Sequence, residues 1–104
     1  MNEKLKSVGE LTGEFIYRVE KGDSLGSIAE KLKTTVQIIV SDNILKEEPS
    51  AGELLLIEKP AGNPYIVKPY DTIERLSFGD KKRELEILRN NKTDFIFVGQ
   101  KIYL

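Results

Sequence analysis

The sequence predicts an α+β protein made of two tandem βααβ modules, each with a strand, two helices and a second strand. Three observations lead to this fold class: an internal repeat, helical spacing of apolar residues between short apolar strands, and a Pro- and Gly-rich break between the halves. The two strands lie at the ends of each module, so they can form a two-stranded antiparallel sheet. Both helices then cover one face of that sheet.

The repeat sets the expected boundaries. The stretch Tyr17-Arg-Val-Glu-Lys-Gly-Asp-Ser-Leu25 is echoed forty-eight positions later by Tyr65-Ile-Val-Lys-Pro-Tyr-Asp-Thr-Ile73. At the same spacing Asn43 corresponds to Asn91, and after one deleted residue Gly52 corresponds to Gly99. We therefore expect a flexible lead over residues 1–14, module 1 over 15–59, a linker over 60–64 and a divergent module 2 over 65–104.

Module 1 shows its elements clearly. Residues 15–19 suit a short strand, and Gly22 permits the turn that follows. Asp23 or Ser24 can cap a helix over 24–33, and a second helix begins after Thr34-Thr35 and ends near Asn43. A final strand covers 53–57. The expected buried helix positions are Leu25, Ile28, Ala29, Leu32, Val36, Ile39 and Val40.

Module 2 follows the same order with departures. Its first strand starts at Tyr65, and Asp71 with Glu74 has the arrangement of a capping box. Gly79-Asp80 interrupts the first helix, which should be shorter by about a turn than its counterpart. Glu84 stands at an expected apolar position of the second helix, where Ile87 and Leu88 compensate. The last strand covers 101–104.

The composition excludes several function classes. The chain of 104 residues contains no His and no Cys, which excludes the usual zinc sites and every His- or Cys-based nucleophile, and we expect no cofactor. Its 16 basic and 17 acidic residues are interleaved, which argues against nucleic-acid binding, and Lys81-Lys-Arg83 is interpreted as a solvated helix end. No apolar run approaches the roughly 20 residues of a membrane span. The polar stretch 1–14 indicates no Sec signal.

The two copies resemble the LysM (lysin motif) domain family over about residues 15–59 and 64–104. In the first copy the resemblance rests on residues 17–25, Ile28-Ala29, Asn43 and Gly52. In the second it rests on Tyr65-Ile-Val67, Asp71-Thr-Ile73, Ile87-Leu88, Asn91 and Val98-Gly-Gln-Lys-Ile102. The family has a βααβ fold and binds polymers that contain N-acetylglucosamine, chiefly peptidoglycan and chitin. The sugar chain lies in a shallow groove between the loop after the first strand and the loop before the last.

Residue by residue, the resemblance implies glycan-binding positions in both copies. Those of module 1 are Gly22, Asp23, Ser24, Leu25, Asn43, Ile44 and Leu45; those of module 2 are Asp71, Thr72, Ile73, Asn91, Lys92 and Thr93, with Tyr70 beside the groove. Structural roles compete with these assignments. Asp23 and Asp71 also suit helix caps, Asn43 and Asn91 suit helix terminators that bond their own loop, and Leu25 and Ile73 suit core positions. The Tyr70 ring would either stack on a sugar or block it. The adjacent Glu47 and Glu48 are interpreted as solvated surface rather than as a catalytic pair.

The resemblance implies a non-catalytic binder of peptidoglycan, or of chitin, in a bacterial cell wall or on a spore surface. The chain would itself be no enzyme, although it could be the targeting part of a larger cell-wall enzyme. The alternative is a protein-interaction or assembly module of the spore-coat or phage-tail type. It would use module 2, where Phe95, Phe97 and Tyr103 form an aromatic group that could contact a protein partner.

Overall fold

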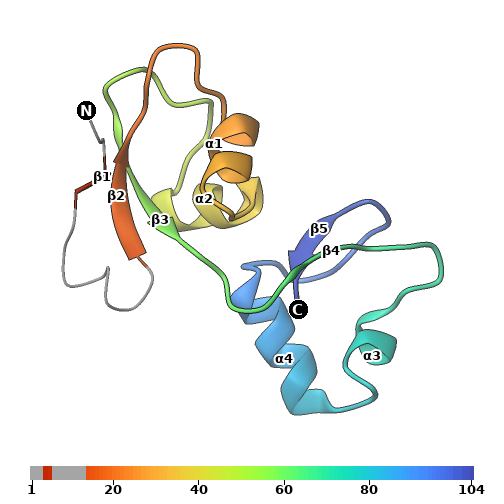
Figure 1. Cartoon of the computed structure of the whole chain (residues 1–104). Helices are drawn as coiled ribbons and strands as arrows, with labels where there is room; N and C mark the ends of the chain where they lie inside the picture. The colour runs from red at the N-terminus through yellow and green to blue at the C-terminus, as the bar shows by residue number, and fades with distance from the viewer. Residues whose placement is uncertain (1–3, 6–13) are drawn as a thin grey trace. The chain divides into compact units, whose positions relative to one another are not determined.

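The chain forms two compact units in a computed structural model that describes residues 4–5 and 14–104. Unit 1 is Met1–Lys59 and unit 2 is Pro60–Leu104 (Figure 1). Each unit has small antiparallel sheets and short helices, so the mixed α+β class predicted from the sequence is confirmed. No helix in the described part of the chain is long and apolar enough to cross a membrane.

Unit 1 has the predicted order of strand, helix, helix and strand. Strand β2 (Glu14–Arg18) pairs antiparallel with β3 (Leu54–Glu58), and the helices α1 (Leu25–Lys31) and α2 (Val36–Asn43) connect them. Alternating side chains of the strands and one stripe of each helix meet in one core, because strands present every second residue to a face and helices every third or fourth. The buried core residues are Phe15, Tyr17, Val19, Leu25, Ile28, Ala29, Ile39, Leu55 and Ile57.

The sheet of unit 1 contains one strand more than the sequence analysis expected. Strand β1 (Lys4–Leu5) pairs antiparallel with β2, with Lys4 opposite Tyr17 and Leu5 opposite Ile16. The two-stranded sheet predicted for module 1 is therefore wrong by one strand, because a two-residue strand depends on its pairing partner and has no periodicity of its own. The expected flexible lead otherwise lies outside the described residues.

Helix α2 differs from the prediction in its buried face. Val36 is 40% exposed, whereas Ile38 is 1% exposed and, with Ile39, forms the buried face of the helix. The predicted burial of Val36 is wrong because Val36 is the first residue of α2, directly after the N-cap Thr35, and lies at the edge of the core.

Unit 2 repeats the order around a smaller core. Strands β4 (Pro64–Ile66) and β5 (Lys101–Tyr103) form a two-stranded antiparallel sheet, joined through helices α3 (Ile73–Leu76) and α4 (Lys81–Asn90). Fully buried apolar residues of this core are Val67, Ile87 and Ile102, against which Tyr65, Ile73, Leu76, Ile96 and Leu104 pack. Tyr103 is 5% exposed and therefore buried, whereas Phe95 and Phe97, with which the sequence analysis grouped it, are exposed.

The helices of unit 2 differ in length from those of unit 1. Helix α3 has four residues against seven in α1, which confirms the predicted loss of about one turn. Helix α4 recovers those residues: Asp80 caps it by accepting from the backbone of Lys82 and Arg83, and it starts earlier than its counterpart. Glu84 consequently lies within α4 and is 9% exposed, paired with Lys81 at 3.6 Å.

Residues 60–64, which the sequence analysis assigned to a linker, are bonded to unit 2. The backbones of Asn63 and Leu104 exchange two hydrogen bonds of 2.8 and 2.9 Å. The side chain of Asn90 bonds the backbone of Ala61 in both directions, at 2.9 and 3.1 Å. Pro64 is already the first residue of β4, so this segment extends the sheet of unit 2 by backbone pairing.

Candidate functional site

The topology brings two loops to the same end of each sheet. In an antiparallel pair, the connection that leaves the first strand and the connection that enters the second strand lie at the same end of the sheet. We call residues 19–25 with 43–53 site 1, and residues 67–73 with 91–100 site 2. These two pairs of loops contain every position for which the sequence analysis proposed glycan binding (Figure 1).

Backbone and side-chain bonds hold the loops of site 1 together. Val19 donates to the Glu53 carbonyl at 2.8 Å, and Gly52 donates back to the Val19 carbonyl at 2.7 Å. Further along, the carboxylate of Glu48 accepts from the backbone N–H of Leu25 at 2.8 Å. Glu48 is exposed, as the sequence analysis expected, and its carboxylate has in addition this bond between the two loops. This contact joins residues 23 positions apart, so no local pattern indicates it.

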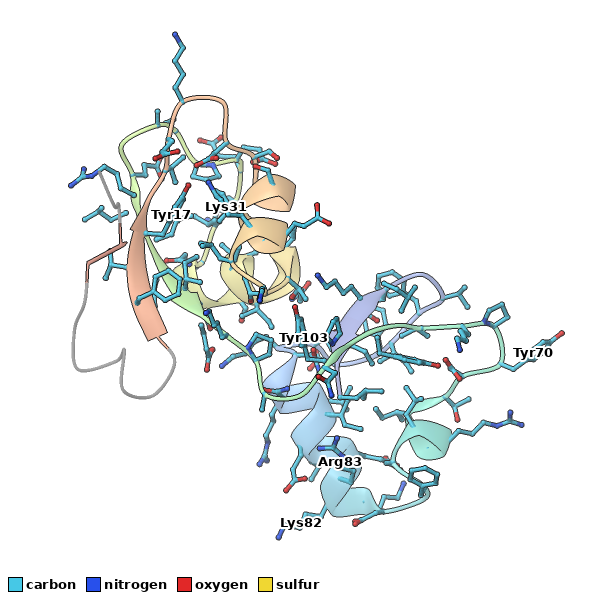
Figure 2. All side chains as sticks on the ribbon, viewed as in Figure 1. Tyr17, Lys31, Tyr70, Lys82, Arg83 and Tyr103 are labelled. Carbon is cyan, nitrogen blue, oxygen red and sulfur yellow. The ribbon has the colours of Figure 1, made fainter. Side chains whose placement is uncertain are left out.

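Tyr17, Asp23 and Lys31 form a polar cluster beside the first loop. The Tyr17 hydroxyl donates to Asp23 Oδ2 and accepts from Lys31 Nζ, both at 2.6 Å (Figure 2). Asp23 also accepts from the Glu20 backbone at 2.8 Å, which closes the turn. Hydrogen bonding, first from Tyr17 and then from Glu20, holds the pKa of Asp23 below its ordinary value. Burial, followed by the bond to Asp23, raises the pKa of Tyr17.

Unit 2 has the same pair at the corresponding place. The Tyr65 hydroxyl donates to Asp71 Oδ2 at 2.5 Å, and Asp71 accepts from the Lys68 backbone at 2.8 Å. The bond from Tyr65 is the largest cause that lowers the pKa of Asp71. The lysine partner is missing, because Gly79 occupies the position that corresponds to Lys31.

These aspartates do not cap the helices. Of the two predicted caps of α1, Asp23 and Ser24, it is Ser24 that caps the helix, by accepting from the Ser27 backbone at 3.1 Å. In unit 2, Thr72 caps α3 by accepting from the Arg75 backbone at 3.0 Å. The predicted capping box of Asp71 and Glu74 is therefore wrong, since the Tyr65 hydroxyl and the turn backbone occupy the Asp71 carboxylate.

Asn43 and Asn91 bond the edge strands rather than their own loops. The Asn43 amide donates to the carbonyls of Ile39 at 2.9 Å and Leu56 at 2.8 Å, and its oxygen accepts from the Leu56 backbone at 2.8 Å. Asn91 repeats all three bonds, with Ile87 and Tyr103 as its partners. Each amide thus pairs with a free strand edge. Asn91 is the C-cap of α4 and Asn43 is the last residue of α2, so the predicted position at the helix end is confirmed. The side chains bond the strands instead of the expected loops, and both have a structural role.

The remaining nominated residues differ in accessibility. Leu25 is 7% exposed and belongs to the core, whereas Ile44 is 81% exposed with a left-handed backbone. Gly22 has φ +90°, which a glycine adopts without strain. Tyr70, at the corresponding position of unit 2, is 85% exposed and projects from its loop (Figure 2). Ser24 and Thr72 are exposed; Leu45, Ile73, Lys92 and Thr93 are half-buried. Within the described residues, no three His, Cys, Asp or Glu side chains gather into a possible metal site.

Comparison with known proteins identifies part of the chain. The crystal structure of the Bacillus cereus spore cortex-lytic enzyme SleL is similar to this chain at 31% sequence identity, with a TM-score of 0.43. The similarity covers 88% of this chain and 22% of SleL, so this chain spans less than a quarter of that protein's length. No curated protein matches the chain. The family model of the LysM domain matches residues 17–50. The chain therefore contains one LysM domain, which includes the first loop of site 1 and most of the second.

Proposed function

We propose that site 1 binds glycans that contain N-acetylglucosamine, with bacterial peptidoglycan as the natural polymer, and that it does so without catalysis. The match of the LysM family model to residues 17–50 carries this proposal, because the matched segment contains the first loop of site 1 and most of the second. The proposal places the chain at a cell wall or spore surface. Chitin shares the same sugar and is a second ligand to test.

The chemistry of site 1 suits a neutral sugar. An N-acetyl group presents one amide donor, one carbonyl acceptor and one methyl group. The exposed backbone of Gly22 can meet the polar atoms, and the exposed side chain of Ile44 can cover the methyl group. Leu25, buried in the core, supports the loop from beneath. Each hydrogen bond to a sugar replaces one to water, so the affinity of one site should be low.

We further propose that unit 2 is a second, divergent copy of the LysM fold. Three hydrogen-bonded features recur at corresponding positions of the two units and support this interpretation. They are the Tyr–Asp bond, the Asn amide on the edge strand, and the paired bonds between the first strand and the turn before the last. Two sites on one chain would raise the affinity for a repeating polymer through effective concentration.

An NMR titration tests site 1 directly. The labelled chain of 104 residues is titrated with a soluble N-acetylglucosamine pentamer, and retention on insoluble peptidoglycan is measured in parallel. We expect shifts of amides in residues 19–25 and 43–53. The Ile44→Ser variant should bind more weakly, whereas Val36→Ser should bind normally. Val36 is a matched control because it is exposed at the other end of α2, about 12 Å away along the helix. Absence of both amide shifts and retention would overturn the proposal.

A further inference from the structure

Unit 2 presents apolar side chains where unit 1 has small or polar ones. At the two turns of site 2, Tyr70 corresponds to Gly22, Phe97 to Ser50 and Val98 to Ala51. The correspondence of the second turn is fixed by a shared bond. The backbone of Ser50 donates to Glu53 Oε1 at 2.9 Å, and that of Phe97 donates to Gln100 Oε1 at 3.0 Å. We call the exposed residues Tyr70, Phe95, Phe97 and Val98 the apolar rim.

The apolar rim lies at one end of the β4–β5 sheet. Val67, the residue after β4, donates to the Gln100 carbonyl at 2.9 Å and accepts from Gly99 at 2.8 Å, so the two turns begin side by side. The rings of Phe95 and Phe97 have centroids 6.1 Å apart and are tilted by 46°. Their exposed fractions are 65% and 55%, and that of Val98 is 60%. Such a group of exposed apolar residues marks a binding surface.

The backbone conformation at Tyr70 is one that a glycine adopts more easily. Tyr70 has φ +74°, a left-handed conformation that is strained for a residue with a side chain and that Gly22 adopts freely in unit 1. Its ring is 85% exposed, so packing within the unit does not offset the strain. Phe78, outside the apolar rim, combines the same two features, so it is the position of the Tyr70 ring in the turn of site 2, and not the strain, that enters the proposal.

The chemistry and the size of the apolar rim favour a sugar chain. One face of a pyranose ring carries mainly C–H groups, which pack on aromatic rings while the ring hydroxyls stay in water. The rim residues belong to the same two loops as the nominated residues Asp71–Ile73, Lys92 and Thr93. A stable protein interface takes about 20–30 residues from each partner, and the rim has four.

We propose that the apolar rim is a stacking surface of unit 2 for the pyranose rings of the glycan. This inference rests on the proposed glycan-binding function of the chain. It assigns the two units different modes of recognition: site 1 would act mainly through backbone hydrogen bonds and one aliphatic side chain, and site 2 through aromatic stacking. The distinction can be tested because the two units give separate amide signals.

The test exchanges rim residues for those of unit 1 in the full chain. Tyr70→Gly and Phe97→Ser introduce residues that the corresponding turns of unit 1 already accommodate, so folding should be preserved. The matched control is Phe78→Gly, since Phe78 is 95% exposed with φ +56° and lies outside the apolar rim. Titration with the N-acetylglucosamine pentamer should shift amides of residues 67–73 and 91–100 in the unsubstituted chain. Each rim variant should lower the affinity of site 2 for the pentamer by about two- to tenfold. The affinity of site 1, and both affinities in the control variant, should stay unchanged.

The outcomes separate the two proposals. If amides of site 1 move and those of site 2 do not, the glycan-binding function stands and the stacking surface is refuted, which would leave a protein as its partner. An equal response of site 2 in Tyr70→Gly, Phe97→Ser and the unsubstituted chain also refutes it. If neither site responds to the pentamer and the chain is not retained on peptidoglycan, both proposals fail.

Discussion

Removing the amide of Asn43 tests whether this residue supports the fold or contacts a ligand. The Asn43→Ala variant loses three hydrogen bonds, one to the preceding helical turn and two to the backbone of Leu56. A hydrogen bond in a folded protein contributes about 0.5–1.5 kcal/mol net. Partial solvent access lets water replace some of the loss, so we expect unit 1 to be destabilised by about 2–3 kcal/mol.

Asn91→Ala provides an internal comparison. Its amide makes the corresponding three bonds but is 2% exposed, so the groups left behind cannot be hydrated as readily. We expect a larger loss, about 3–4 kcal/mol, in unit 2. Ser41→Ala is the control for unit 1, since Ser41 is exposed on α2 and should change stability by less than about 0.5 kcal/mol.

Urea unfolding followed by unit-specific amide signals is the suitable assay. A single unfolding free energy is not defined for a chain of two units, so each unit needs its own probes. The structural role of Asn43 is refuted if Asn43→Ala unfolds within 0.5 kcal/mol of the unsubstituted chain. If that variant also loses glycan binding, Asn43 is a ligand contact after all.

Four further substitutions concern single residues. Because the folded pKa of Asp23 is depressed, its contribution to stability is present above about pH 4 and disappears as pH falls through the folded pKa. The unfolding free energy of Asp23→Asn should therefore change less with pH in the acid range than that of the unsubstituted chain. Equal slopes of the two curves would contradict this. In urea unfolding, Gly62→Ala should destabilise unit 2 by at least about 1 kcal/mol, since the added Cβ would overlap the Leu104 backbone. In the same assay, Gly26→Ala in α1 should stabilise unit 1 by about 0.5–1 kcal/mol. Glu84→Leu should stabilise unit 2 by about 1 kcal/mol, because one oxygen of this buried carboxylate has no hydrogen-bond partner; a lower urea midpoint would refute that.

The helices and strands could be predicted from the sequence because their signals are local. Helix α1 begins and ends within two residues of the predicted 24–33 range, and β3 is displaced by one residue from 53–57. Apolar spacing reports which side of a short element faces the core. Strand β1 was missed because it exists only through its pairing with β2.

The contacts of the candidate site were harder to predict, because they join distant residues. The carboxylate of Glu48 accepts a hydrogen bond from Leu25 because the fold brings their two loops together, and the sequence near either residue does not indicate this bond. The role of Asp71 could have been found: Tyr and Asp are spaced six residues apart in both copies, at 17 and 23 and at 65 and 71. A tyrosine hydroxyl at that repeated spacing competes with the helix for the carboxylate.

The shared hydrogen bonds explain where the two units are free to differ. The Tyr–Asp pair, the Asn amide and the strand-to-turn bonds fix the backbone of both sites, and most of them are made by backbone atoms or by side chains directed inward. Side chains at the turn tips contribute little to this framework, so Gly22 and Tyr70 can occupy the same position, both with positive φ. A difference in ligand recognition between the units is therefore expected at these tips, where substitution changes the surface and leaves the fold intact.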